Sequence, residues 1–431
     1  MHDMALSRRN FIGSLGAMAG AAALPRMAWA SAAAEARFPH VTAMLDRYVS
    51  SGKLPGMVSA LGWGASEAPL DIARGTLAKG MAAPVGMDSL FRIYSMTKPI
   101  TGMAAMMLVD EGKLRLDQPI ADLLPAYGRM MVQTTPDGSI TDLRPAKTQI
   151  TVRHLLTHTA GLGYSIIQKG PIKDAYIAAG LVPGQASRMP LPGMDAPRPL
   201  KSLSEFADVL ATMPLVYEPG TTWSYSVALD LMGRVIELAS GKPFDAFLAE
   251  RVFEPCGMTS TGFRVAAADV DRLTTNYAAV SGMLLPIDPA KASIYLDAPP
   301  YPFGGAGLVS SPRDYDRFLR MLLGFGRIDG RQVMSEAAVR QGTSNLLPAG
   351  TDLSRSFIKG NGFGAGGSVG LGADAGTYGW AGAAGTVGFV NYTVGLRAGV
   401  YTQYMPSDTY PVHREFAQAV LADVTGKKAA S

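Results

Sequence analysis

The chain has 431 residues, of which 48% are hydrophobic and 17% are charged, and its formal net charge is +4. Because no basic tract or charged block stands out from this near balance, the sequence argues against a nucleic-acid or membrane-surface partner. Cys256 is the single cysteine, which excludes an internal disulfide and leaves stability to the hydrophobic core. A chain of this length predicts two domains.

The first thirty residues predict an export signal. Residues 7–13 (Ser-Arg-Arg-Asn-Phe-Ile-Gly) form a twin-arginine start, an apolar run follows over 12–24, and residues 28–30 read Ala-Trp-Ala, a cleavage site. The apolar run is too short to span a membrane. We therefore expect residues 1–30 to be removed and the remaining chain to be periplasmic or secreted by the twin-arginine route, without stable membrane insertion.

The rest of the chain begins with a short sheet-forming region and continues with helices. We expect a helix over 38–49, a strand over 57–63 and a second short strand that leads into Ile93. From residue 95 to about 296 the pattern indicates helices and long loops. These comprise a helix over 151–158 that stops at Gly161, an irregular Pro- and Gly-rich loop over 168–203 near a pocket, and a helix over 227–239 closed by Gly241.

Strand patterns return near the C-terminus. We expect a helix over 312–324, strands over 377–383, 386–393 and 397–403, and a terminal helix over 408–424. A sheet assembled from both chain ends and flanked by terminal helices, with a helical domain inserted, explains this order. The expected fold is thus α/β plus all-α, with residues 31–94 and 300–431 in an antiparallel-sheet domain and 95–299 in a mainly helical one. A cleft between two such domains is a common place for an active site.

Ser95 is the strongest candidate for chemistry. It opens Ser95-x-x-Lys98 at the start of an amphipathic helix whose apolar residues follow at 100, 103, 104, 107 and 108, with Gly112 at its end. That spacing places the hydroxyl and the amine one turn apart on one face, at a helix N-terminus that favours negative charge. A serine needs such a partner, because its free hydroxyl is a poor nucleophile at neutral pH.

A second Ser-x-x-Lys, Ser356 to Lys359, competes with the first. It runs into a glycine-rich stretch, Gly360-Asn361-Gly362-Phe363-Gly364, which cannot continue a helix. Its two side chains would not share a rigid face, so the sequence favours Ser95.

Five motifs follow one another along the chain. They are Tyr-Ser-Met-Thr-Lys at 94–98, Arg-His-Leu-Leu-Thr-His-Thr-Ala-Gly-Leu at 153–162, Glu-Pro-Gly-Thr at 218–221, Tyr-Ser at 225–226, and Gly-Gly-Ala-Gly-Leu-Val-Ser-Ser at 304–311. In this order the chain resembles the serine β-lactamase-related hydrolases, which include class C β-lactamases, D-alanyl-D-alanine carboxypeptidases and family VIII carboxylesterases. The resemblance covers about residues 38–425 and implies a β-lactamase/transpeptidase-like fold.

The resemblance also implies roles. Ser95 would be the acylated nucleophile, Lys98 its amine partner, and Tyr225 the general base, with its phenol kept acidic by Lys98. Whether Lys98 or Tyr225 is the principal base stays open. The backbone N–H groups of Ser95 and Ala383 would form the oxyanion hole, and no metal or cofactor is needed. The residues implied in substrate binding are Tyr164, Val227, Trp380 and Gly382.

Two departures from the family pattern select a branch. Val227 stands where the Tyr-x-Asn motif has Asn, and Trp380-Ala381-Gly382 replaces Lys-Thr-Gly. A β-lactamase uses that Asn to hold the substrate amide and the Lys to attract its carboxylate, whereas Trp380 offers an apolar wall to an uncharged acyl or alcohol group. This resembles the family VIII esterases, so we expect a serine carboxylesterase acting on short to medium acyl esters of small molecules, with a weak β-lactamase side activity.

Other functions remain open from sequence. A β-lactamase or D-Ala-D-Ala carboxypeptidase is the nearest alternative, and a non-catalytic peptidoglycan- or peptide-binding protein is one of another class. Gly366-Gly367-Ser368-Val369-Gly370 matches the α/β-hydrolase elbow, with Asp408 and His413 in the right chain order, but it lacks the strand-to-helix context. His154 and His158 have a metal-like i, i+4 spacing, yet without a third ligand helix capping or packing is favoured.

Overall fold

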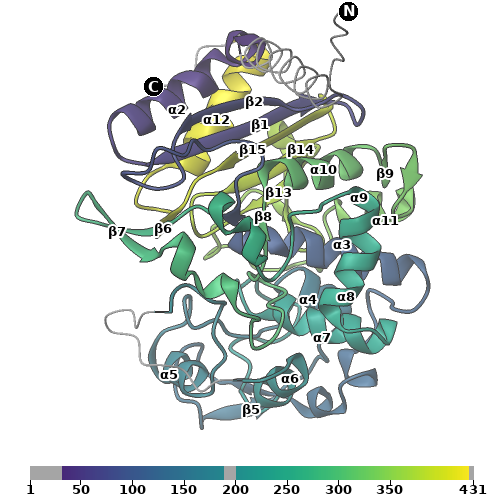
Figure 1. The fold of residues 1–431 in the computed structure, drawn as a ribbon. Coiled ribbons are helices and arrows are strands. Elements are labelled where there is room, and N and C mark those ends of the chain that lie inside the picture. Colours follow the sequence, from purple (N-terminus) through teal and green to yellow (C-terminus); the bar gives the residue numbers. More distant parts are fainter. Residues whose placement is uncertain (1–31, 189–199, 427–431) are drawn as a thin grey trace, which may run out of the picture.

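The computed structural model describes residues 32–188 and 200–426, so the export signal expected at 1–30 lies outside the described residues. Its centre is a seven-stranded antiparallel sheet in the order β11-β12-β13-β14-β15-β1-β2 (Figure 1). The strands are β1 Gly56–Trp63, β2 Leu70–Gly75, β11 Gly362–Phe363, β12 Ser368–Val369, β13 Thr377–Ala381, β14 Val387–Asn391 and β15 Leu396–Tyr401.

The N-terminal and C-terminal parts of the chain pair with each other within this sheet. Val58 of β1 pairs with Tyr401 of β15, and Trp63 pairs with Leu396. The strands expected at 57–63, 377–383, 386–393 and 397–403 are therefore confirmed to within a few residues, and so is a sheet built from both ends of the chain.

Helices cover both faces of the sheet. On one face, α2 (Pro39–Ser50) and α12 (Val412–Thr425) pack against each other, and on the other lies α10 (Pro312–Leu323) (Figure 1). Side chains of β1 alternate between the two cores: Met57 and Leu61 join the core beneath α2 and α12, while Val58 and Ala60 join the larger core. A strand buried on both faces is apolar throughout, which is why its sequence shows no polar alternation.

The remaining elements lie mostly below the sheet in Figure 1. The helices are α3 Thr97–Asp110, α4 Val152–Leu156, α5 Gly170–Ala178, α6 Leu203–Leu210, α7 Ala228–Ser240, α8 Phe244–Leu248, α9 Glu254–Cys256 and α11 Glu336–Gly342. The short strands are β3 Phe91–Arg92, β4 Met131–Gln133, β5 Leu143–Pro145, β6 Asn276–Val280, β7 Met283–Asp288, β8 Val309–Ser310, β9 Arg327–Ile328, β10 Arg331–Gln332 and β16 Tyr404–Met405. None of the helices within 32–188 and 200–426 is long and apolar enough to cross a membrane.

Several expected elements differ from those observed. The stretch from 95 to 296 also contains strands, among them the β6–β7 hairpin, whose Ser281 and Gly282 both have positive φ (+50° and +78°). Two such residues form the tight turn that matches strand twist. The loop at 168–203 holds helix α5, and α12 begins at Val412 rather than 408, directly after Pro411, which disfavours helix before it. The division into two domains stays a prediction.

Cys256 ends α9 and is fully buried, as expected of a small apolar residue. Burial raises the pKa of the thiol to about 12, and only the thiolate reacts readily with disulfide reagents. We expect no reaction of the native protein with an aromatic disulfide reagent at pH 8 and one equivalent per chain after unfolding in urea. Fast modification without urea would show that the α9 region opens.

Candidate active site

Ser95 lies on a single 3-10 turn, Tyr94–Met96, between β3 and α3. Tyr94 has φ of +41°, a left-handed conformation that costs a residue other than glycine about 1–3 kcal/mol. Packing holds it there: Tyr94 is buried, and the side-chain amide of Asn276 donates to its hydroxyl at 3.1 Å. The strained turn therefore fixes the backbone that carries Ser95, which is itself partly exposed.

The helix after Ser95 differs from the expectation in one respect. α3 begins at Thr97, two residues after Ser95, and ends at Asp110, with Gly112 in the left-handed region just beyond it. Every residue from 97 to 108 is buried, so α3 is a core helix and not an amphipathic one. Solvent reaches no face of this helix because it packs against α7, α11 and strand β13 of the sheet.

Lys98 is fully buried and contacts Ser95 directly. Its Nζ donates to Ser95 Oγ at 3.1 Å and to the carbonyl oxygen of Gly305 at 2.7 Å. The same Nζ lies 4.5 Å from the centroid of the Tyr225 ring, close enough for a cation–π interaction. The hydroxyl, amine and phenol that the sequence groups together are thus neighbours in space.

Tyr225 precedes α7 and reaches across to the sheet. Trp380, on β13, donates its indole N–H to the Tyr225 hydroxyl at 3.0 Å. An N–H donated to the phenol oxygen stabilises negative charge on that oxygen. The sequence predicted Trp380 only as an apolar wall, so it did not reveal this hydrogen bond. The direction of the single indole N–H depends on the fold and cannot be predicted from the sequence.

The other expected substrate-binding residues lie deeper. Val227 is fully buried in the core, and Tyr164, 2% exposed, packs edge-on behind Tyr225 with ring centroids 5.4 Å apart. A Cβ on Gly382 would come within 2.4 Å of the Ile93 carbonyl oxygen, so only glycine lets this turn approach the strand before Ser95. The turn places Ala383 against the small buried cluster of Tyr94, Ala306 and Ala384, and Tyr94 directly precedes the nucleophile.

Aromatic rings form one wall beside Tyr225. Trp380 lies 5.1 Å from Phe363 and 6.0 Å from Phe357 between ring centroids, and Trp223 lies 5.0 Å from Phe357. Phe357 is 66% exposed although its ring contacts two other rings of this wall, Trp223 and Trp380, and the ring of Tyr225. These residues, Trp223, Phe357, Phe363 and Trp380, are called the aromatic wall below. The sequence showed only Trp380 of them, because only the fold brings Trp223 together with the segment that holds the other three.

His158 lies behind the site and is not part of a metal centre. It has φ of +55° and follows the end of α4, so it does not share a helix with His154, which instead caps α4 by accepting from Thr151 N–H. Burial, aided by the charge of Lys98, holds the pKa of His158 well below its ordinary value and keeps the ring neutral. In the described part of the chain, no cluster of three or more His, Cys, Asp or Glu side chains could hold a metal.

The rival serines lack partners for catalysis. Ser356 donates to the Leu353 carbonyl from a turn, with no helix to align Lys359. Ser368 lies within β12 and lines a groove of about 630 Å³ between the sheet and α12, so the strand-to-helix elbow is absent. Across the residues that the structure describes, Nε2 of His413 has no hydrogen-bond partner, which leaves the alternative triad unconnected.

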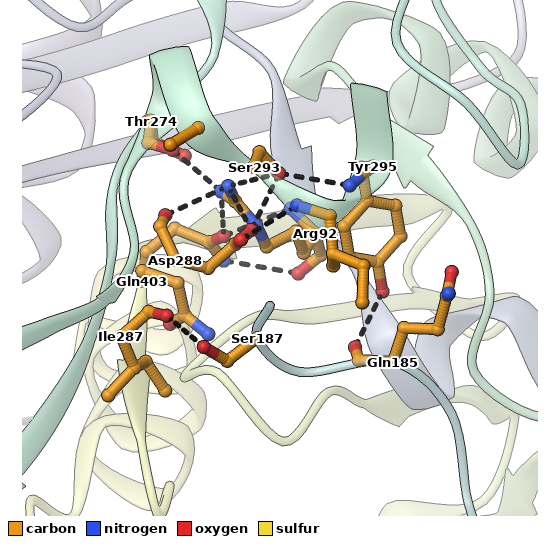
Figure 2. A network of polar contacts seen from close by, with 12 residues as sticks. Arg92, Gln185, Ser187, Thr274, Ile287, Asp288, Ser293, Tyr295 and Gln403 are labelled. Carbon is orange, nitrogen blue, oxygen red and sulfur yellow. Dashed lines mark hydrogen bonds and ion pairs between the residues drawn. The ribbon is translucent and has the colours of Figure 1, made fainter. Parts of the chain in front are cut away.

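A buried ion pair holds the strand that leads into Ser95. Figure 2 shows Arg92, on β3, at the centre of this network, where its Nε donates to Asp288 Oδ2 at 2.6 Å and its Nη1 to the Thr274 carbonyl at 2.6 Å. Gln403 accepts from the Arg92 N–H and donates to the Arg92 carbonyl, both at 3.1 Å. Side chain and backbone are therefore both fixed three residues before the nucleophile, a feature that the sequence did not reveal.

The chain is similar to known proteins over most of its length. A family model described as Beta-lactamase matches residues 41–423. Protein Rv1367c of Mycobacterium tuberculosis is 37% identical over 322 residues, 70% of this chain and 74% of that protein. Esterase EstB of Burkholderia gladioli is 32% identical over 266 residues, 58% of this chain and 61% of that esterase.

Solved structures give the same fold. EstCE1, titled a hydrolase with promiscuous acyltransferase activity, is 25% identical with a TM-score of 0.71, over 90% of this chain and 100% of that one. The fold is thus β-lactamase/transpeptidase-like, with helices and an antiparallel sheet, as the motifs imply.

Proposed function

The chain belongs to the beta-lactamase family, and from this premise we propose that it is a serine carboxylesterase that hydrolyses short to medium acyl esters through an acyl-enzyme on Ser95. The observation that carries the proposal is the buried Lys98 amine, 3.1 Å from Ser95 Oγ and 4.5 Å from the centre of the Tyr225 ring. Such a cluster is what an unactivated serine needs to become a nucleophile.

The reaction proceeds in two halves. Tyr225, as phenolate, takes the Ser95 proton while Oγ attacks the ester carbonyl, and the Lys98 ammonium and the Trp380 N–H stabilise the charged phenol oxygen. The N–H groups of Ser95 and Ala383 bind the oxyanion, each worth about 3 kcal/mol by analogy with other hydrolases. Tyr225 returns the proton to the departing alcohol. Water then loses a proton to Tyr225 and attacks the acyl-enzyme. Tyr225 passes this proton to Ser95 Oγ as the acid departs, which restores both the hydroxyl and the phenolate.

The aromatic wall supports an ester over a β-lactam as substrate. It offers apolar surface where a lactamase attracts a carboxylate, and Val227 is buried and has no amide to hold a substrate amide. EstB and EstCE1, named an esterase and a hydrolase, support the same choice. Because β-lactam cleavage uses the same acyl-enzyme, we expect a weak β-lactamase side activity. The twin-arginine start at 7–13 supports a periplasmic or secreted location.

Parallel substrates test the proposal. We would follow p-nitrophenyl butyrate, a chromogenic cephalosporin and an acyl-D-Ala-D-Ala peptide with the full chain, and weigh the intact protein after a fluorophosphonate probe. We expect fast ester turnover, slow cephalosporin cleavage and one probe adduct. Faster cephalosporin or peptide cleavage would favour a lactamase or carboxypeptidase, and no turnover with no adduct would favour a binding protein.

Phe357 provides a test of specificity. Because it is the exposed member of the aromatic wall, its removal takes apolar surface from the acyl or alcohol group. We expect Phe357→Ala to lower kcat/KM for p-nitrophenyl octanoate about fivefold, or about 1 kcal/mol, and to leave the acetate ester nearly unchanged. Leu421→Ala, at an equally exposed residue on α12, is the control. An equal loss for both esters would contradict a role for Phe357 in binding.

A further inference from the structure

Asp230 is a buried carboxylate for which the proposed reaction has no use. It lies in the first turn of α7, 1% exposed, between two leucines. Its Oδ1 accepts from the backbone N–H of Gly305 at 2.9 Å, while Oδ2 has no hydrogen-bond partner among the described residues. A buried charge with half of its hydrogen bonds unmade is costly unless an opposite charge lies close by.

Gly305 connects Asp230 to the active site. The N–H of this residue binds the Asp230 carboxylate, and its carbonyl oxygen accepts from Lys98 Nζ at 2.7 Å. A Cβ on Gly305 would lie 2.6 Å from Asp230 Oδ2, and one on Gly304 would lie 2.4 Å from the Leu229 carbonyl oxygen. Two glycines therefore allow the loop before β8 to reach α7, so that a single residue touches both the carboxylate and the amine.

Lys98 supplies the positive charge that interacts with the Asp230 carboxylate. Three groups from different segments interact with Asp230: Lys98 from α3, Tyr164 from the loop after α4 and Tyr301 from the loop before β8. Burial raises the pKa of Asp230 to about 6, against the lowering effect of Lys98, so the carboxylate is ionised at neutral pH. Burial, with Asp230 adding to it, raises the pKa of both phenols, which stay neutral.

We infer that Asp230 is the positioning residue of Lys98: through Gly305 it fixes the carbonyl that holds Nζ beside Ser95, and its carboxylate supplies the opposite charge to the amine. This inference rests on the proposed function, because it concerns the same reaction. Positive charge on Lys98 would stabilise the Tyr225 phenolate. The rings of His158 and Tyr164, which also face Lys98, are neutral and supply no competing charge.

The test is the pH dependence of kcat/KM for p-nitrophenyl butyrate. Asp230→Asn keeps the shape and an acceptor for Gly305 N–H but removes the charge. We expect the alkaline limb of the profile to move to lower pH by about one unit or more, with at least a tenfold loss at pH 9. Asp314→Asn is the matched control, since Asp314 is equally buried but accepts from Ser260 N–H and the Thr261 hydroxyl, and not from the loop that holds Lys98.

Two outcomes overturn the inference. Limbs within a few tenths of a pH unit of wild type would show that Asp230 does not set the charge of Lys98. An acid limb that moves to lower pH, with faster turnover at pH 7, would show that Lys98 acts as the free amine. Both differ from failure of the proposed function, in which the wild-type chain itself neither turns over the ester nor takes the probe on Ser95.

If thermal melting shows that Asp230→Asn does not fold, a second variant tests the link through Gly305. Gly305→Ala keeps the carboxylate but forces it away from the loop, because the new Cβ would overlap Oδ2. We expect slower labelling of Ser95 by the fluorophosphonate and the same direction of shift in the alkaline limb. An unchanged labelling rate and profile would overturn the link through Gly305.

Discussion

Replacing Ser95 by alanine lowers kcat for p-nitrophenyl butyrate at least about a thousandfold, because Ser95 is the one serine among the described residues that hydrogen-bonds to Lys98 Nζ. The variant folds as the wild type does, since Ser95 is partly exposed and its removal leaves no packed cavity. The measurement is initial rate at several ester concentrations, together with the mass of the protein after the serine-reactive probe. The adduct found on the wild type is expected to be missing.

Two serine variants serve as controls for this result. Ser356→Ala and Ser368→Ala each remove a hydroxyl from a motif that competes in the sequence, and neither hydroxyl contacts Lys98. Both variants should keep wild-type turnover and take up one probe molecule. If turnover survives in Ser95→Ala and is lost in Ser368→Ala, the assignment of the nucleophile is wrong.

Replacing Arg92 by methionine destabilises the protein by about 3–5 kcal/mol, the cost typical of breaking a buried ion pair from one side. Asp288, 1% exposed, would lose its guanidinium partner and keep a charge that the core cannot solvate. The measurement is urea unfolding of the full chain followed by tryptophan fluorescence. Because Gln403 also binds the Arg92 backbone, we expect the variant to keep most of its turnover at low temperatures, at which it is still folded.

The comparison with a surface pair sharpens this prediction. Arg313 pairs with Asp88, but both side chains are more than half exposed, so Arg313→Met should cost less than about 1 kcal/mol. Adding Asp288→Asn to Arg92→Met should recover part of the loss by removing the stranded charge. Equal stability of the two single variants would mean that the network in Figure 2 contributes no more than a surface contact.

Features that depend on local spacing were predictable from sequence. Ser95 and Lys98 lie three residues apart in one chain segment, so a single helical turn suffices to bring them together. The end of α7 at Gly241, with φ of +70°, likewise follows from glycine's freedom to adopt the left-handed conformation. The paired strands near both chain ends follow from their alternating or fully apolar patterns.

Features that depend on distant partners were not predictable. Asp230 looks like one polar residue on a helix, and only the fold places Gly305 against its carboxylate. Trp380 reads as an apolar side chain until Tyr225 is known to lie at its N–H. The wrong expectation that α3 has a solvent face has the same cause, because the segments that cover it come from remote parts of the chain.

The pairing of Val58 with Tyr401 has a consequence for biosynthesis. While the ribosome is still adding the middle of the chain, β1 has β2 beside it but no neighbour on its other edge, and it is apolar on both faces. An unpaired apolar edge invites association with other chains. The sheet can close only when β15 has been made, and contacts between such distant residues form slowly. The nascent protein therefore has to be shielded from aggregation until synthesis is almost complete.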